Sequence, residues 1–386
     1  MLSIPFTKRN SRSLTLAALK GAAMLAAIIS SPVLAQSTLV YVGAYTRPPS
    51  KGISAYRLDA ATGQMTPLGL AGETSNPTFL AVHPNRKFLY AVNEENEGGV
   101  SAFAIDPSSG RLKPLNRVSS RGAGPCHLAV SEAGDWLYAA NYNSGSVAAF
   151  PIGGDGSLGE AAGFVQHAGS SVNPQRQRGP HAHSANLAPG NRFLLAADLG
   201  LDQILVYRLD AGTGPFTPGD PPFARLAGGS GPRHMAFSRD GRFAYAVNEM
   251  LATVTAFRWD AARGRLEELQ TVAMTAADYA GPRSAAEIAV HPSGRFLYAS
   301  HRGDSTVAVF RIDPGKGTLT AIERTPTGGK TPRNFAIDPT GAWLLAANQD
   351  SGNVVQFRID PESGRLSASG RTVEVASPVC IVFVKQ

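Results

Sequence analysis

Seven near-copies of one strand–turn–strand segment run along the chain and constrain its fold more than any other feature. Each copy is an alternating aromatic or apolar strand ending in Asp or Gly, then a Gly-containing turn and the next strand. The copies occupy residues 56–65, 103–112, 150–158, 207–216, 257–266, 310–319 and 357–366. A second hairpin, of which AVHPNRKFLYAVN (81–93) is one copy, recurs between them. Two hairpins per repeat of about 50 residues predict an all-β, seven-bladed β-propeller.

The two ends of the chain do not fit a complete repeat by themselves. Residues 38–72 hold three strands of a blade with no innermost strand before them, and the tail SPVCIVFVKQ (377–386) is an innermost strand with nothing after it. An open array would leave exposed sheet edges. We therefore expect the C-terminal strand to complete the N-terminal blade and close the ring of one domain, residues 36–386.

The first 35 residues have the pattern of a cleaved secretory signal. A basic start, an apolar stretch (21–29) and the small residues near Val33-Leu34-Ala35 follow in that order. We expect cleavage, a periplasmic or secreted domain, and no membrane association afterwards; an uncleaved N-terminal anchor is the alternative.

Charge and cysteine content exclude further classes of protein. The signal holds four cations and no acid, so its removal lowers the formal net charge from +7 to +3. That is an ordinary surface, and we expect no nucleic-acid partner. Cys126 and Cys380 begin innermost strands of blades that are not neighbours. An oxidising compartment would allow a disulfide, but buried free thiols are the expected state.

Chemistry is expected where the irregular connections lie, on the face opposite the short repeated turns. Two positions per blade converge there on the mouth of the central channel: the start of the innermost strand and the end of the next one. A spacing of fourteen residues should put them side by side, as in His127/Asn141, His234/Asn248 and Glu287/His301. Burying so many polar groups is costly unless they pair with each other or with a ligand.

At two equivalent positions near this mouth, the residue type varies from blade to blade. Arg233 and Arg333 share the register at the strand start, where the pattern also places His183, whereas Glu249 and Arg302 share the register at the strand end. The Asn residues that recur at the strand ends are expected to cap turns, and His127 and His234 can equally bond backbone carbonyls. The other candidate substrate-binding residues are His127, His181, His234, Glu287, Arg333 and Glu94.

At these residues the sequence resembles the seven-bladed lactonase family, which includes the propeller-type 6-phosphogluconolactonases and a fungal carboxymuconate-lactonising enzyme. The resemblance runs from VGAYT (42–46) to PVCIVF (378–383). It is most specific in NPQRQRGPHAHSA (173–185), GPRHMAFSRDGRFAYAVNE (231–249) and NQDSGNVVQFRID (348–360). By motif, the resemblance implies the catalytic residues His183, Arg233, Glu249 and Arg302.

Those residue types suit lactone hydrolysis. The reaction needs a base for the attacking water, cations for the tetrahedral oxyanion and an acid for the departing ring oxygen. Either Glu249 or His183 can be the base, with the other returning the proton, while Arg233 and Arg302 hold the developing charge. Arg333 is expected to orient the substrate together with His127. The chain has no G-x-S-x-G elbow, which disfavours an acyl-enzyme on Ser.

We expect neither a metal nor another cofactor. His181 and His183 are two apart and, on one strand, would point the same way, but no further ligands stand at recognisable spacing. The expected partner is a small lactone, 6-phosphogluconolactone or glucono-1,5-lactone, and the export signal favours the unphosphorylated one. A carboxymuconate-type lactonising or cyclising enzyme and a non-catalytic ligand- or partner-binding periplasmic propeller are the alternatives.

Overall fold

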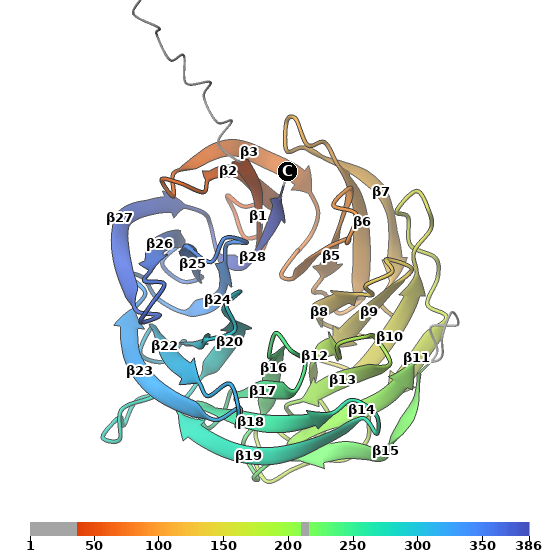
Figure 1. Cartoon of the computed structure of the whole chain (residues 1–386). Helices are drawn as coiled ribbons and strands as arrows, with labels where there is room; N and C mark the ends of the chain where they lie inside the picture. The colour runs from red at the N-terminus through yellow and green to blue at the C-terminus, as the bar shows by residue number, and fades with distance from the viewer. Residues whose placement is uncertain (1–36, 210–215, 386) are drawn as a thin grey trace, which may run out of the picture. The chain divides into compact units, whose positions relative to one another are not determined.

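The described residues of the computed structural model form a ring of antiparallel sheets. Residues 37–209 and 216–385 are described, and within them there are 28 strands and no helix. The strands form seven four-stranded sheets arranged as blades around a central axis (Figure 1). The predicted seven-bladed propeller is thereby confirmed. The predicted signal peptide (1–35) lies outside the described residues.

Each sheet runs from an innermost strand outward to the rim. The blade that joins the two ends of the chain consists of β28 (Pro378–Lys385), β1 (Ser37–Ala44), β2 (Gly52–Asp59) and β3 (Met65–Glu73). The next three blades are β4 (Leu80–Val82), β5 (Phe88–Asn93), β6 (Gly99–Ile105) and β7 (Leu112–Ser119); β8 (Pro125–Val130), β9 (Trp136–Asn141), β10 (Ser146–Pro151) and β11 (Gly163–Gln166); and β12 (Ala182–Leu187), β13 (Phe193–Asp198), β14 (Gln203–Leu209) and β15 (Phe216–Arg225). The last three are β16 (Pro232–Phe237), β17 (Phe243–Asn248), β18 (Thr253–Asp260) and β19 (Arg265–Ala273); β20 (Ala285–Val290), β21 (Phe296–His301), β22 (Thr306–Ile312) and β23 (Leu319–Pro326); and β24 (Pro332–Ile337), β25 (Trp343–Asn348), β26 (Asn353–Ile359) and β27 (Leu366–Glu374).

The ring closes as expected from the two incomplete ends. The C-terminal strand β28 pairs antiparallel with β1, with Val40 opposite Phe383 and Val42 opposite Ile381. In Figure 1 the first and last strands of the chain lie in one blade. This pairing satisfies the backbone groups of β1 that would otherwise form a free edge next to the axis.

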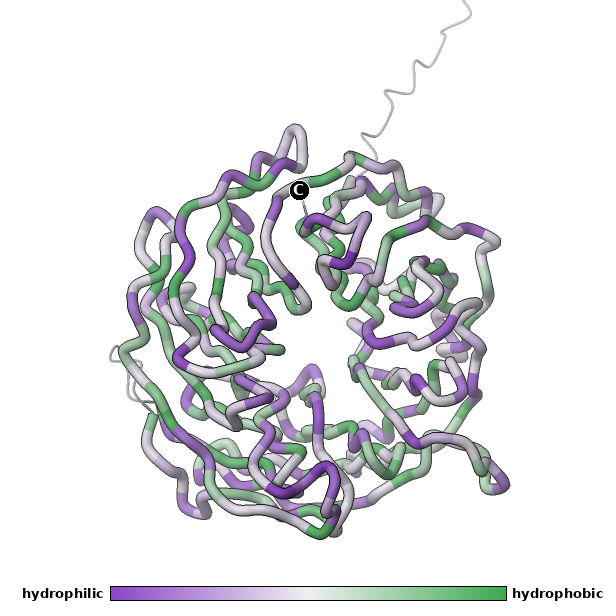
Figure 2. The backbone as a smooth tube through the Cα atoms, turned by 180° about the vertical axis from the view of Figure 1, so that it is seen from behind, coloured by the Kyte–Doolittle hydropathy of each residue, from purple (hydrophilic) through white to green (hydrophobic). Residues whose placement is uncertain are grey.

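The hydrophobic core lies between the blades. Alternation along each strand sends one set of side chains toward each neighbouring blade. One cluster combines Tyr245 and Val254 of one blade with Leu297 and Phe310 of the next, all at most 1% exposed. Figure 2 shows hydrophobic and hydrophilic residues interspersed around the whole ring. Burying each large apolar side chain stabilises the fold by roughly 1.5–3 kcal/mol.

The repeated turns on the lower face are structural, as expected. His83 and His291 each donate through Nε2 to a carbonyl oxygen of the following blade, at 2.8 Å in both cases. Asp260 accepts hydrogen bonds from the backbone amides of Ala262 and Arg263 in the turn that follows it. Cys126 and Cys380 are buried and not disulfide-bonded. No part of the described chain forms a helix long and apolar enough to cross a membrane.

Candidate active site

A residue with a left-handed backbone conformation precedes the innermost strand and helps to position the strand ends at the mouth of the channel. Gly231 has φ of 61° and Thr331 has φ of 60°. The carbonyl oxygen of Gly231 accepts a hydrogen bond from the amide of Glu249 at 2.8 Å, which fixes Glu249 just beyond the end of β17. A Cβ on Gly231 would lie 2.9 Å from Sδ of Met250, so this position combines a positive φ with a close contact that favours glycine.

A β-bulge then interrupts the pairing at the start of several innermost strands. The register shifts between Ala182 and Ser184, between Pro232 and His234, and between Pro332 and Asn334. The extra residue in each case is His183, Arg233 or Arg333, so these three share one register, as the sequence pattern indicated. A bulge re-aims the side chain of the inserted residue.

The bulges also correct one prediction. The fourteen-residue pairs are not directly opposite each other, because the inserted residue shifts the register: Pro125 rather than His127 lies opposite Asn141. The side chain of Asn141 is buried and donates to the carbonyl oxygen of Ser120 and to Oγ of Ser146, both at 3.1 Å. Asn141 is therefore a structural residue that joins the end of β9 to the start of β10 and to the connection that follows β7 of the preceding blade.

Glu249 is the centre of the site. Its carboxylate contacts three guanidinium groups: Oε1 lies 2.8 Å from Nη2 of Arg176, and Oε2 lies 2.8 Å from Nη2 of Arg302 and 3.2 Å from Nε of Arg233. Burial alone would raise the pKa of this carboxyl group, but the charges of Arg302, Arg233 and Arg176 outweigh it and lower the pKa to about 2. Glu249 is therefore a carboxylate at neutral pH and a weak base.

His183 lies beside this cluster as a neutral imidazole. Its Nε2 is 3.9 Å from Oε2 of Glu249, and its side chain is 6% exposed. Burial, followed by the charge of Arg233, holds the pKa of His183 well below 6.5. On its other side, Sγ of Cys126 lies 3.7 Å from Nδ1 of His183, and burial raises the pKa of that thiol. A neutral imidazole can accept a proton, whereas the neighbouring thiol stays protonated.

A second polar group faces the mouth from the ring-closing blade and its two neighbours. Tyr45 donates to Oε1 of Glu94 at 2.9 Å, and Thr78 donates to Oε2 of the same carboxylate. The guanidinium of Arg333 lies over the ring of Tyr45, with 5.7 Å between Cζ and the ring centroid. Arg333 forms no ion pair with any residue in 37–209 or 216–385, so its charge is available to an anionic group.

These residues line one cavity of about 240 Å³ at the mouth of the channel. Of the predicted site residues, the structure places five in its lining, and Arg233 lies directly beneath them in contact with Glu249. The lining consists of Glu94, Cys126, Tyr142, Asn143, Arg176, His183, Glu249, Arg302 and Arg333. The walls are strongly polar, and the size suits a small ligand.

Besides Arg233, four predicted residues lie outside this lining. His181 precedes β12 rather than lying within it; its ring stacks on Tyr142 at 4.6 Å and its Nδ1 donates to the carbonyl oxygen of Tyr142 at 2.9 Å. His127 stacks on Phe79 at 4.2 Å below the mouth. His181 and His183 both contact the ring of Tyr142, but they are not successive same-face residues of one strand, because His181 precedes β12 and His183 is the bulge residue.

The other two, His234 and Glu287, lie deeper along the axis. They pair with each other at 3.0 Å, between Nδ1 of His234 and Oε1 of Glu287. Nδ2 of Asn334 donates to the second carboxylate oxygen of Glu287. The sequence pattern placed these residues at the mouth because it does not reveal how far along the axis each side chain lies.

Sequence reasoning missed Arg176. This residue belongs to the loop between β11 and β12, where its backbone amide donates to Oδ1 of Asn173 at 2.9 Å. The next residue, Gln177, is fully buried and donates to the carbonyl oxygen of Leu199 at 2.8 Å, which anchors the loop. Nη2 of Arg176 also donates to the hydroxyl of Tyr142 at 3.1 Å. The sequence signal that could have indicated Arg176 is the close spacing of cationic residues in the NPQRQR segment.

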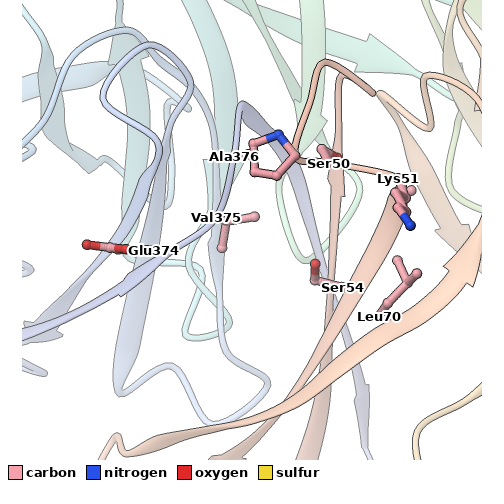
Figure 3. A pocket seen from close by; sticks show the side chains of 9 residues that line it. Ser50, Lys51, Ser54, Leu70, Glu374, Val375 and Ala376 are labelled. Carbon is pink, nitrogen blue, oxygen red and sulfur yellow. The ribbon is translucent and has the colours of Figure 1, made fainter.

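A second hollow lies at the rim of the same face, between the end of β27 and the blade of β1–β3. It has a volume of about 300 Å³ and includes Ser50, Lys51, Leu70, Glu374 and Val375 in its lining (Figure 3). It contains one cation, one acid and no imidazole, so it lacks the acid–base set of the central cavity. Within the described residues, no group of three or more His, Cys, Asp or Glu side chains is arranged to hold a metal ion; the absence of a metal requirement stays a prediction.

Comparisons with known proteins agree with the fold. Residues 39–383 match the family model described as lactonase, 7-bladed beta-propeller. The 6-phosphogluconolactonase of Bacillus subtilis is 36% identical over 353 residues, 90% of this chain and 98% of that protein. Among solved structures, a periplasmic gluconolactonase of Pseudomonas aeruginosa superposes with a TM-score of 0.86 at 37% identity, covering 90% of this chain and 99% of that one.

A putative 6-phosphogluconolactonase of Bacteroides fragilis is similarly close, with a TM-score of 0.86, 38% identity, and coverage of 91% of this chain and 98% of that one. These matches extend over nearly the whole propeller and are not confined to the repeated hairpins. The chain is therefore a lactonase enzyme and belongs to the family of seven-bladed β-propeller lactonases.

Proposed function

We propose that the protein hydrolyses a sugar lactone, glucono-1,5-lactone in preference to its 6-phosphate, to the open-chain acid. The observation that carries this proposal is a neutral imidazole, His183, beside a carboxylate that holds three guanidinium groups in one small polar cavity. This arrangement offers a base and preorganised positive charge at the same place, as addition of water to an ester carbonyl requires.

His183 is the proposed base. Its pKa lies well below 6.5, so it is neutral and ready to take a proton from the attacking water. Glu249, with a pKa of about 2, is poorly suited to that task. It holds the guanidinium groups in place, because a carboxylate fixed by several arginines restricts their rotamers.

Arg302 and Arg176 are the proposed partners of the oxyanion. Both line the cavity and reach Glu249 through a single Nη2 atom each, at 2.8 Å. Nε of Arg302 is buried without a hydrogen-bond partner among the described residues. Protonated His183 then returns its proton to the departing ring oxygen, and the tetrahedral intermediate opens to the acid.

Arg333 and Glu94 are the proposed substrate-binding pair on the other side of the cavity. The carboxylate of Glu94 can accept hydrogen bonds from sugar hydroxyls, and Arg333 can donate to them. A periplasmic location is proposed as well. It is supported by the predicted signal in residues 1–35 and by the similarity to a periplasmic gluconolactonase, and it favours an unphosphorylated substrate.

The test is acid release measured by pH-stat with glucono-1,5-lactone and with its 6-phosphate, at a pH where spontaneous opening is slow. We expect turnover of the unphosphorylated lactone by the wild type and a loss of roughly 10²–10³-fold in kcat for Glu249→Gln, because the cation cluster loses its fixed partner. Glu362→Gln removes an 83% exposed acid from the opposite face and should leave the rate unchanged. Preference for the 6-phosphate would contradict the substrate assignment, and no acceleration of either lactone would contradict the function.

A further inference from the structure

Tyr142 lines the central cavity, but the chemistry proposed above gives it no part. Its ring stacks on His181, with 4.6 Å between the ring centroids and an interplanar angle of 20°, and it meets the ring of His183 edge-on at 5.1 Å. Its backbone is held as well: the amide donates to the carbonyl oxygen of Gly124 at 2.8 Å, and the carbonyl oxygen accepts from Nδ1 of His181 at 2.9 Å. The phenol oxygen therefore has a fixed position in the cavity wall.

The hydroxyl of Tyr142 has a proton that is not yet used. Its oxygen accepts a hydrogen bond from Nη2 of Arg176 at 3.1 Å, and among the described residues the hydroxyl makes no hydrogen bond as a donor. A phenol oxygen can accept one hydrogen bond while its proton is donated to another group. Because the guanidinium occupies the accepting side, the proton is directed away from Arg176 and is available to a ligand in the cavity.

Two of the arginine atoms that contact Glu249 are, by contrast, already committed. Nη2 of Arg176 carries two hydrogens and donates both to Oε1 of Glu249 and to the hydroxyl of Tyr142. Nη2 of Arg302 lies 2.8 Å from Oε2 of Glu249 and donates to the carbonyl oxygen of Ala285 at 3.1 Å. Both guanidinium groups still supply positive charge to the cavity. The phenol O–H is a donor that an oxyanion can engage without breaking any contact of this cluster.

We propose that Tyr142 is a further catalytic residue, whose hydroxyl donates a hydrogen bond to the oxyanion of the tetrahedral intermediate beside the charges of Arg176 and Arg302. When water adds to the lactone carbonyl, its proton passes to His183 and the carbonyl π electron pair becomes the oxyanion. The O–H bond of Tyr142 stays intact in this step. The electron pair then re-forms the carbonyl while the ring C–O bond breaks, and His183 gives its proton to the ring oxygen. The proposal rests on the proposed function.

The environment of Tyr142 suits a donor that keeps its proton. Burial raises the pKa of its hydroxyl, and the hydrogen bond with Arg176 offsets that rise only in part. The hydroxyl is therefore protonated at neutral pH. A hydrogen bond to a negatively charged oxygen is stronger than one to a neutral carbonyl, so this contact stabilises the transition state more than the bound lactone. Because stacking already fixes the ring, the donor needs no reorganisation when the charge develops.

The test compares steady-state kinetics of the purified wild type and Tyr142→Phe with glucono-1,5-lactone by pH-stat. We expect kcat and kcat/KM to fall together by roughly 10²-fold, the lower end of the usual cost of removing one oxyanion donor, because the arginine charges remain. Tyr298→Phe is the matched control. It removes the hydroxyl of a buried tyrosine that donates to the carbonyl oxygen of Gly364, in a turn of the opposite face, and should have the wild-type rate.

A second comparison separates a direct contact with the oxyanion from a role in holding Arg176. Arg176→Lys keeps a positive charge, so we expect measurable activity, but it has no Nη2 atom to join Tyr142 to Glu249. Tyr142→Phe should lower kcat by at least about tenfold in this background too, because the hydroxyl acts on the oxyanion itself. If Tyr142→Phe leaves kcat of Arg176→Lys unchanged, the hydroxyl only positions the guanidinium and the proposal is overturned.

The remaining outcomes separate this role from the proposed function. An active wild type with an unchanged kcat in Tyr142→Phe overturns the role of Tyr142 alone. A rise in KM at constant kcat does so as well, since it would show a contact made equally to the bound lactone. A wild type that opens no lactone overturns both proposals. If circular dichroism shows that Tyr142→Phe does not fold, Tyr142→Leu, which also lacks the hydroxyl, takes its place with the same expected fall in kcat.

Discussion

Replacing Glu249 by Gln should destabilise the fold in a manner that depends on pH. The carboxylate is 7% exposed and contacts Arg176, Arg233 and Arg302. A pKa lowered from the ordinary 4.5 to about 2 corresponds to about 3 kcal/mol of stability at neutral pH. A value of that size matches the cost of about 3–5 kcal/mol for removing one partner of a buried ion pair.

The sign follows from the direction of the shift. A carboxyl group with a lowered pKa in the folded state contributes fully above its unfolded pKa, and the contribution is lost as the pH falls from about 4.5 to about 2. Urea unfolding of the wild type and Glu249→Gln should therefore differ by about 3 kcal/mol at pH 7 and by much less near pH 2.5. The exposed pair broken by Glu362→Gln should cost less than about 1 kcal/mol at either pH.

A difference that stays the same at both pH values would refute the reasoning, because it would mean that Glu249 stabilises the fold by packing and not as a charged partner of the arginines. A difference near zero at pH 7 would refute the assignment of these contacts as a compensated buried cluster. Both results are read from the same four unfolding curves, one for each protein at each pH.

Four further results are expected. A chain that ends at Ala376 lacks β28 and should show no cooperative unfolding transition by circular dichroism, since β1 loses its inner partner; a native-like transition would contradict ring closure as a requirement. Arg333→Gln should raise KM about tenfold, the effect of about 1.4 kcal/mol, and change kcat little, while Arg358→Gln on the lower face should change neither; an unaltered KM would remove Arg333 from the substrate site. The plot of kcat/KM against pH should be level near neutrality and fall only at a pH well below 6.5, where His183 becomes protonated; a midpoint above 6.5 would exclude His183 as the base. Dialysis against EDTA should leave the rate unchanged, and a loss restored by a divalent cation would show a metal requirement.

The propeller itself was predictable because its repeat occurs many times in the sequence. Turn residues at fixed offsets and strand alternation repeat in every blade, and the ends of the chain complement each other as β28 and β1. The equivalence of His183, Arg233 and Arg333 could also be read from the repeat, since the bulge recurs at one position. Local signals that agree across seven copies leave few competing folds.

The depth and orientation of individual side chains could not be predicted in the same way. A bulge has no unique sequence signature. The predicted pairing of His127 with Asn141 was therefore wrong, because the bulge inserts one residue and Pro125 lies opposite Asn141 instead. Arg176 reaches Glu249 from a loop whose path depends on the burial of Gln177. Such contacts join blades that are far apart in sequence, and the sequence repeat does not predict them.

The central claim is that this mouth hydrolyses a sugar lactone through His183. The most direct measurement is the initial rate of acid release from glucono-1,5-lactone by the wild type and by His183→Gln, both shown to be folded. We expect measurable turnover by the wild type and a fall in kcat of roughly 10²–10⁴-fold in the variant, the usual contribution of a general base. Equal rates for the two proteins would contradict the account.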